Sequence, residues 1–497
     1  MRPHTMVLPF VLLLFVMQNT TGDQAVDNFR VGFGKAETTP TITETFNDTN
    51  HNFLFDGDMN NPNGAEKFKD TNDNGRFDAV FIAGRGEPRP ANSVRDPLWA
   101  RAVVFETKEG SMGIVVLDLL GLMDHDCDTL RRNAAALKLG HVIVACTHTH
   151  DGPDTLGLWG PKGVCGADPA YVAFVCKQGA RALAEAAKNL TPAQLVVGET
   201  PVADLHEDDR PPHITDDLCQ VIRAVSTSGE RTLGSIVVWS AHPETMSGRN
   251  NSLSPDFPAA TIAKLERDWG GICLYLNSAI GTQQQPTQRP LKDASSRDLP
   301  PDSAERAAQI GRLLAERAEK YLATSGEKVV SPTLRYATHE FFIEPKNEGL
   351  VEKMKAGLVR RVIYKNGVPT KDFAGPVQIK IRMTLLRIGP IDFLTVPGEL
   401  NPELEVGLPP GFNSNQGPIH AENYTVRKPL NTILRGKYKI VIGMGEDELG
   451  YIVPECDWRM TYYEPHMSVS PEMERIVIEQ TERLVADPAT TESASSR

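Results

Sequence analysis

Two histidines in residues 147–153 (THTHDGP) have the types and spacing of a metal or catalytic site. They follow the apolar run 141–146, which predicts a short buried strand. Residues two apart on a strand point to the same side, so we expect His148 and His150 to face one spot at the strand's end. Neutral imidazole is the commonest metal ligand in proteins. Two ordinary polar residues at a strand end would look the same, so the interpretation depends on partners elsewhere in the chain.

Partners of the required chemistry occur beside other strand-like runs and turns. His242 ends one apolar run, and Glu399 follows another at a Pro-Gly turn. Tyr451 and Tyr463 lie close together in the sequence, and Arg210 stands in a turn rich in Asp and Pro. Each residue alone has an ordinary structural explanation. Together they offer nitrogen and oxygen ligands suited to zinc, with cationic and phenolic donors for an oxyanion.

The ordered set of motifs resembles the catalytic domain of the neutral, non-lysosomal ceramidases, and more closely their bacterial ceramidase-like relatives. THTHDGP is similar to THTHSGPG in that family, and the stretch at His242 resembles its second histidine segment. Pro-Gly-Glu at 397–399 resembles its zinc glutamate. GYIVPE at 450–455, followed by Tyr463-Glu464, resembles its tyrosine segment, and Arg-Pro-Pro at 210–212 resembles its arginine-serine-proline turn.

The resemblance implies a zinc-dependent amidohydrolase that cleaves an N-acyl bond with zinc-activated water. It assigns His148, His242, Glu399 and Tyr451 as zinc ligands, and His150, Arg210 and Tyr463 as catalytic residues that position the carbonyl and stabilise its oxyanion. Spacing alone would make both His148 and His150 ligands, so their separate roles come from the resemblance. Zinc lowers the pKa of bound water to about 7, and His150 is suited to pass a proton to the leaving amine.

Two departures leave the substrate open. The family's Gly-Asp-Val-Ser-Pro-Asn loop corresponds to residues 277–284, where Gln284 replaces the serine and Thr282 the aspartate. The family's C-terminal β-sandwich domain is expected to be absent, because the chain ends soon after Tyr463. The alternatives are a zinc hydrolase for an ester, a lactone or another small substrate, and a non-catalytic, calcium-stabilised binding protein on the same scaffold.

A second metal signal lies in an acidic insert at residues 44–80. The pattern D-T-N-x-N-x-x-F-D occurs twice, beginning at Asp48 and at Asp70. Oxygens at positions 1, 3, 5 and 9 of a loop suit Ca²⁺, although neither copy has the glutamate at position 12 of an EF-hand. The expected structural calcium ligands are Asp48, Asn50, Asn52, Asp56, Asp70, Asn72, Asn74 and Asp78. The alternative is an Asx-rich surface loop without an ion.

These residues must be positioned by an α/β fold. The expected strands are 29–39, 113–119, 141–146, 195–198, 219–225, 235–239 and 272–276, and the expected helices are 128–139, 168–190, 257–269 and 301–323. A β-richer C-terminal portion (334–343, 377–388 and 391–395) precedes a closing helix at 471–485. We therefore expect one large mixed-sheet catalytic domain with flanking helices over residues 26–486, carrying the insert, and a disordered tail at 487–497.

The N-terminus predicts export. Residues 1–25 carry Arg2, His4 and then the apolar run 6–17, which is the pattern of a secretory signal peptide and too short for a membrane span. No later stretch predicts a transmembrane segment. We expect a periplasmic or secreted protein. The net charge of −12 argues against a nucleic-acid partner, no pattern indicates a protein partner, and the expected partner is a small-molecule or lipid-like N-acyl substrate.

Overall fold

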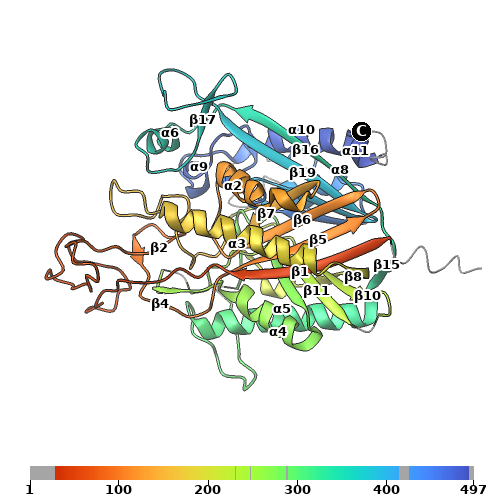
Figure 1. The fold of residues 1–497 in the computed structure, drawn as a ribbon, viewed down its shortest axis with the longest axis horizontal. Helices are drawn as coiled ribbons and strands as arrows, with labels where there is room; N and C mark the ends of the chain where they lie inside the picture. Colours follow the sequence, from red (N-terminus) through yellow and green to blue (C-terminus); the bar gives the residue numbers. More distant parts are fainter. Residues whose placement is uncertain (1–27, 230, 247, 287–288, 413–424, 492–497) are drawn as a thin grey trace, which may run out of the picture.

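The computed structural model describes residues 28–229, 231–246, 248–286, 289–412 and 425–491 of the chain (Figure 1). The signal peptide predicted for residues 1–25 lies outside these ranges. Among the helices that the structure describes, none is long and apolar enough to cross a membrane. All seven cysteines are free thiols.

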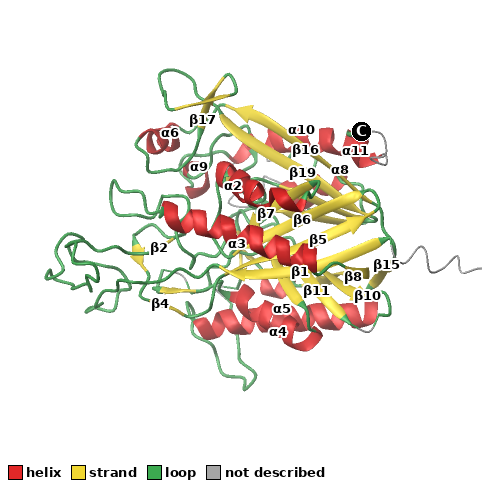
Figure 2. Ribbon diagram, in the orientation of Figure 1, coloured by secondary structure: helices red, strands yellow, loops and turns green. Residues whose placement is uncertain are grey.

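A mixed sheet of nine strands forms the centre of the molecule (Figure 2). Its strands are β1 (Phe29–Glu37), β5 (Trp99–Thr107), β6 (Gly110–Leu117), β7 (His141–Cys146), β8 (Thr191–Pro201), β10 (Leu218–Ser226), β11 (Thr232–Trp239), β13 (Ile272–Asn277) and β15 (Glu327–Val329). The strand order is β13-β11-β10-β8-β1-β5-β6-β7, with β15 paired to β8. The β6–β7 and β11–β13 pairs are parallel and the others antiparallel, so the predicted mixed sheet is confirmed.

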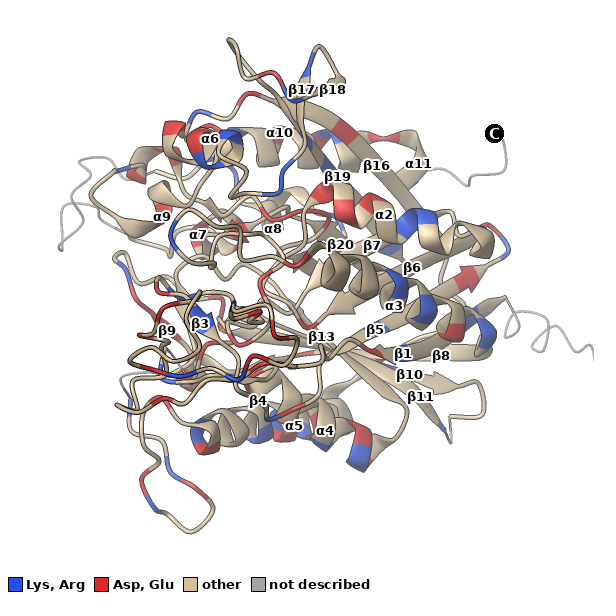
Figure 3. Cartoon of the chain, turned by 60° about the vertical axis from the view of Figure 1, so that its left-hand side comes forward, with Lys and Arg blue, Asp and Glu red and all other residues tan. Residues whose placement is uncertain are grey.

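Helices cover one face of this sheet. They are α2 (Asp124–Ala134), α3 (Pro169–Lys188), α4 (Phe257–Trp269) and α5 (Ala304–Ser325). Alternate residues of each strand divide between the two faces: Ala102 and Val104 of β5 pack in the α3 cluster, whereas Val103 and Phe105 pack on the opposite side. Figure 3 shows basic and acidic residues interleaved along α4 and α5, as on a solvated outer face.

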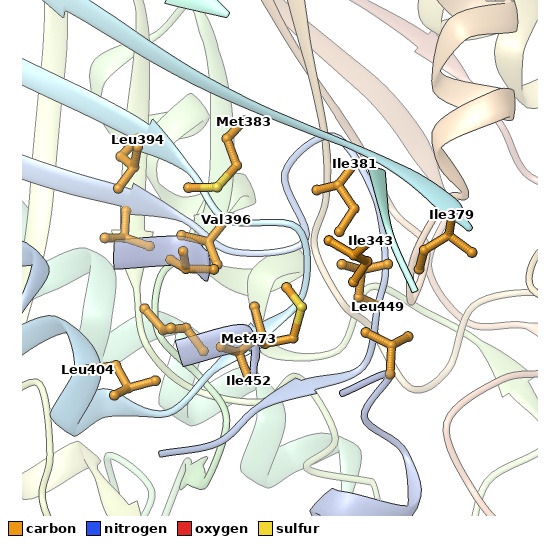
Figure 4. Packing of buried hydrophobic residues seen from close by; sticks show 14 of the residues in the cluster. Ile343, Ile379, Ile381, Met383, Leu394, Val396, Leu404, Leu449, Ile452 and Met473 are labelled. Atoms are coloured by element: carbon orange, nitrogen blue, oxygen red, sulfur yellow. The ribbon is translucent and has the colours of Figure 1, made fainter. Parts of the chain in front are cut away.

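A second sheet covers the opposite face. It contains β16 (Leu334–Ile343), β19 (Ile379–Ile388), β20 (Ile391–Thr395) and β22 (Tyr438–Ile442), in that order. Its inner residues share a core with the nine-stranded sheet, and its outer residues pack against α10 (Met473–Ala486). The layers are therefore helix, sheet, sheet and helix. Figure 4 shows that this outer core also holds Val396, Leu449 and Ile452, from segments on either side of the candidate site residues Glu399 and Tyr451.

Short elements lie in the connecting loops. They are β2 (Phe81–Ile82), β3 (Arg89–Pro90), β4 (Ser93–Val94), β9 (Glu207–Asp208), β12 (Ser252–Leu253), β14 (Gln283–Gln284), β17 (Ile363–Lys365), β18 (Val368–Thr370), β21 (Glu399–Leu400), β23 (Tyr451–Ile452), α6 (Glu348–Lys355), α7 (Pro402–Val406), α8 (Leu430–Ile433), α9 (Tyr463–His466) and α11 (Pro488–Thr491). Of these, β21, β23, α6 and α9 carry residues that line the candidate site.

Several predicted element boundaries need correction. The helix expected at 128–139 is α2, which begins at Asp124, where acidic residues in its first turn suit a helix N-terminus. It ends at Ala134, before a 3-10 turn and the left-handed residue Lys138. Strands β5 and β22 and helix α6 were not expected. The predicted tail at 487–497 begins with helix α11, which buries Thr490, and residues 492–497 lie outside the described ranges.

The acidic insert is built from two copies of one hydrogen-bonded loop. In the first copy, the amides of Asn50 and Asn52 donate to Asp56, and in the second copy the amides of Asn72 and Asn74 donate to Asp78. The repeat is longer than the sequence pattern suggested, because each copy begins with a glutamate four residues earlier and reads E-x-F-x-D-T-N-x-N-x-x-F-D. A small core of Phe46, Phe55, Phe68 and Phe77 lies between the copies.

The two glutamates are exchanged between the copies. Glu66, which opens the second copy, accepts hydrogen bonds from the backbone N–H groups of Thr49 and Asp56 in the first. Glu44, which opens the first copy, accepts those of Thr71 and Asp78 in the second. Both carboxylates are buried. Each loop is therefore held by a side chain that belongs to the other repeat.

This exchange gives a reciprocal prediction. Glu44→Ala should loosen the distant loop 70–78 and leave the adjacent loop 48–56 less affected, because it leaves buried donors unsatisfied at about 1–3 kcal/mol each. Glu66→Ala, its matched partner, should loosen 48–56 instead. Hydrogen exchange measured on peptides from both loops distinguishes the two variants. If hydrogen exchange became faster only in the loop next to each substitution, the pairing of each glutamate with the other repeat would be contradicted.

Candidate active site

The two histidines of THTHDGP lie beyond β7 and not on it. Strand β7 ends at Cys146, and His148 has φ +60°, in the left-handed region. Strand alternation was therefore the wrong reason to expect His148 and His150 to lie together. The rings nevertheless meet, with centroids 5.0 Å apart, and the ring of His242 lies 5.1 Å from His148 and 5.5 Å from His150. All three are buried, and ligand nitrogens from the three rings lie within 4.8 Å of one another.

A buried arginine holds the loop that carries His150. The Arg89 side chain is fully buried, its guanidinium lies 3.4 Å from Asp151, and it donates hydrogen bonds to the carbonyl oxygens of Ala83 and His150. Asn250 donates to the same Asp151 carboxylate at 2.8 Å. These contacts fix the turn that follows β7.

Two of the histidines share one carboxylate. His148 Nδ1 lies 2.8 Å from the Leu120 carbonyl oxygen and His242 Nδ1 lies 2.9 Å from that of Gln283. Both carbonyls can accept an Nδ1–H, which directs Nε2 of each ring toward Glu399, at 3.5 Å and 3.0 Å from Oε2. A carbonyl behind Nδ1 is the usual arrangement around a metal-binding histidine.

The charges of Glu399, His148 and His242 favour a positive charge between the carboxylate and the two imidazoles. Burial alone would raise the pKa of Glu399, but the neighbouring imidazoles of His148 and His242 hold it below its ordinary value. Burial would lower the pKa of His242, yet its hydrogen bond to Glu399 raises it to about 9. A divalent cation among these donors would supply the same positive charge. The donor set therefore fits a metal ion.

Tyr451 reaches the same place through a strand pairing. Strands β21 and β23 pair in parallel and put Glu399 opposite Tyr451. The Tyr451 ring lies 6.5 Å from that of His242 and 5.9 Å from that of Tyr463, measured between centroids. Burial raises the pKa of Tyr451, and the charge of Glu399 adds to the effect. All four predicted zinc ligands are thus brought together, while their role as ligands stays a prediction.

Sequence reasoning missed a second polar group beside His150. Glu244 Oε2 lies 3.1 Å from His150 Nδ1 and 2.7 Å from a terminal guanidinium nitrogen of Arg85. Burial lowers the pKa of His150 to about 4. Burial would raise the pKa of Glu244, but His150 and Arg85 hold it below its ordinary value. The position of Glu244, two residues after His242, was the available signal.

Arg210 does not line the cavity that the other site residues share. Its guanidinium donates to Asp457 at 2.7 Å and to Glu464 at 2.6 Å, and it lies over the Tyr462 ring at 4.6 Å. These contacts tie the turn at 208–212 to the segment that carries Tyr463. Tyr463 itself lines the cavity and is 62% exposed at its edge. A direct contact of Arg210 with an oxyanion remains a prediction.

A narrow cavity of about 60 Å³ opens from the histidine cluster. His148, His150, Glu399, Tyr451 and Tyr463 line its polar end. Its other walls are largely apolar and include Leu120, Leu156, Trp159, Leu350, Met354 and Val359. An apolar cavity with a few convergent polar groups is the usual form of a small-molecule site.

The loop that departs from the expected family pattern supports His242. Strand β14 pairs with β9, and Gln284 also forms a bridge with His242. The neighbouring Gln283 supplies the carbonyl behind His242, and its side chain accepts from the Asp216 backbone N–H and donates to the Ala279 carbonyl. The loop at 277–284 thus fixes the orientation of a candidate ligand.

Fold and site together define an α/β protein with a buried, metal-compatible histidine cluster at the end of an apolar cavity. No family model matches the sequence, and no curated protein matches it. The neutral ceramidase from Pseudomonas aeruginosa is similar in structure, with a TM-score of 0.65 and 15% identity over 92% of this chain and 74% of the ceramidase. A structure of a ceramidase complexed with C2 is similar to the same degree, at 15% identity and TM-score 0.65, over 92% of this chain and 75% of that one. The fold is that of neutral ceramidase, which confirms at the level of the fold the resemblance drawn from the motifs.

The approach of the turn before β23 to the Met467 backbone depends on Gly450. This residue has φ +74°, and a Cβ there would lie 1.6 Å from the Met467 carbonyl oxygen. Gly450→Ala should lower the free energy of unfolding by at least about 2 kcal/mol, from left-handed strain and overpacking. The control is Gly86→Ala, whose Cβ would meet no atom within 4 Å and which should change stability by less than ~0.5 kcal/mol. Equal denaturant midpoints for the two variants would contradict this account.

Proposed function

We propose that this protein is a zinc-dependent hydrolase that cleaves an amide (N-acyl) bond. The observation that carries the proposal is the cluster of His148, His150 and His242, buried at the polar end of an apolar cavity with Glu399 against two of its rings. The likeness of the fold to that of a neutral ceramidase supports the same reaction class.

The zinc ligands in this proposal are His148, His242, Glu399 and Tyr451. Two imidazoles, a carboxylate and a phenolic oxygen form a four-coordinate nitrogen and oxygen set, which suits zinc. The carbonyls behind His148 and His242 fix the ring orientation that such ligands need. When bound, zinc polarises a carbonyl and makes water a stronger nucleophile at neutral pH.

The remaining residues act on the substrate. The Tyr463 phenol, at the rim of the cavity, would donate a hydrogen bond to the oxygen of the attacked carbonyl. His150 would carry a proton to the leaving amine, because its Nε2 is buried and lacks a partner among the described residues. Arg210 would act mainly by holding the 457–464 segment in place.

The substrate class follows from the apolar walls of the cavity. We propose an N-acyl compound with an apolar, lipid-like portion, because walls such as Leu156, Trp159 and Met354 bury apolar surface and offer few hydrogen bonds. Ceramide is one candidate. Because Gln284 stands where the family has a serine, esters, lactones and other amides are also included among the substrates to be tested. The signal-like residues 1–25 support export to the periplasm or the medium as part of the proposal.

We also propose that the insert binds Ca²⁺ for stability. Its two loops present carboxylate and amide oxygens at matching positions, in a segment whose own core consists of little more than four phenylalanines. Bound cations would neutralise Asp48 and Asp56 in one loop and Asp70 and Asp78 in the other.

The zinc proposal is tested with His148→Ala. The wild-type protein should contain a stoichiometric amount of zinc and hydrolyse members of a panel of N-acyl substrates, whereas the variant should lose both. His213→Ala, which changes an exposed histidine outside the cluster, is the control and should retain both. Metal analysis by mass spectrometry and product analysis by chromatography provide the readouts.

Other outcomes identify the alternatives. Turnover of O-acyl substrates alone would replace the amidase with an esterase. A wild-type protein without zinc, unaffected by His148→Ala, would favour a binding protein on the same scaffold.

The calcium proposal is tested by chelation. EGTA should lower the melting temperature, and Ca²⁺ but not Zn²⁺ should restore it, because hard oxygen ligands prefer calcium. Asp70→Ala should remove the part of the response that comes from the loop at 70–78. An equal melting temperature with EGTA and with Ca²⁺ would contradict calcium binding by these loops.

A further inference from the structure

We propose that Glu244, held by Arg85, is a positioning residue that fixes the ring orientation and tautomer of His150. The inference rests on the proposed hydrolase, in which His150 acts on the substrate. It adds a pair of residues to the site to which the sequence motifs assigned no role.

The geometry makes Glu244 the partner of one ring nitrogen of His150. Its Oε2 lies 3.1 Å from His150 Nδ1, and both side chains are nearly buried, with exposures of 12% and 10%. Both ring nitrogens of His150 are buried, and neither forms a well-aligned hydrogen bond with the described residues. Glu244 is the carboxylate next to Nδ1, and a carboxylate at this distance favours the tautomer with the proton on Nδ1 and the lone pair on Nε2. The ring therefore presents Nδ1 to a carboxylate and leaves Nε2 without a protein partner among the described residues.

The partner of His150 differs in kind from those of the other two histidines. His148 and His242 have backbone carbonyls behind Nδ1. His150 has a carboxylate, a partner found behind histidines that carry a proton during hydrolysis as well as behind metal-binding histidines. The charge beside Nδ1 therefore sets His150 apart from the other two rings of the cluster.

The loop at 83–86 supplies the rest of the support. The Arg85 guanidinium lies 2.7 Å from the same Glu244 oxygen, which keeps that carboxylate in place. Gly84 has φ +95°, and a Cβ at this position would lie 2.5 Å from His150 Cγ, so its backbone lies directly against the ring. Glu244 therefore holds the edge of the imidazole, and Gly84 restricts its rotation.

The test uses the zinc-loaded enzyme and Glu244→Gln, which keeps the shape, removes the negative charge and replaces one acceptor oxygen with an NH₂ donor. Loss of the carboxylate that fixes a catalytic histidine's tautomer costs about 10⁴-fold in kcat in serine hydrolase triads, and we expect a loss of at least about 10²-fold here. KM and zinc content should stay near the wild-type values. Asp209→Asn is the matched control, because it removes an exposed carboxylate near the site, and it should retain wild-type kcat.

A second readout does not depend on turnover. In protein with ¹⁵N-labelled histidine, the His150 signals, assigned with His150→Gln, should show the Nδ1–H tautomer in the wild type and lose it in Glu244→Gln. Arg85→Ala, at a partly exposed position, should lower kcat in the same direction but less, and replaces Glu244→Gln if that variant does not fold. Unchanged kcat with an unchanged tautomer, or a change in KM alone, would overturn the role of Glu244. If the wild type neither binds zinc nor hydrolyses any substrate, the proposed function fails, while the tautomer measurement still decides the role of Glu244.

Discussion

The carboxylate of Glu399 lies between imidazoles that come from two separate strand ends, and the rest of the site is arranged around this contact. His148 follows β7 and His242 follows β11, both in the nine-stranded sheet. Glu399 follows β20 in the second sheet. The two sheets share a buried core, so the packing of one against the other sets the distance between acid and base. Burial makes this contact strong, because neither the carboxylate nor the imidazoles can be solvated separately.

Much of the site's composition could be predicted from local signals. Apolar runs that end in His, Glu or a Pro-Gly turn marked the carboxyl ends of strands, where sites of α/β proteins gather. The helix α4 and the strands β16 and β20 matched their predicted limits because apolar periodicity alone defines them. The meeting of His148 and His150 was also expected, although a left-handed residue and not strand alternation produces it.

What the sequence could not reveal depends on long-range pairing. Glu244 meets Arg85 because of the path of the loop at 83–86, and nothing local in either segment indicates the other. Arg210 was expected in the pocket, but two acids from the 457–464 segment engage it. Leu350 and Met354 form a cavity wall from α6, a helix of eight residues that was not expected from the sequence. Such contacts are set by topology, which periodicity does not encode.

The exchange of Glu44 and Glu66 has a consequence for how the insert could be moved to another protein. One repeat alone lacks the acceptor that closes its own loop, so neither copy carries all of its own hydrogen-bond partners. The shortest segment that could be transplanted with these hydrogen bonds is therefore residues 44–80. Either half alone would lack the glutamate that accepts the N–H groups of its loop.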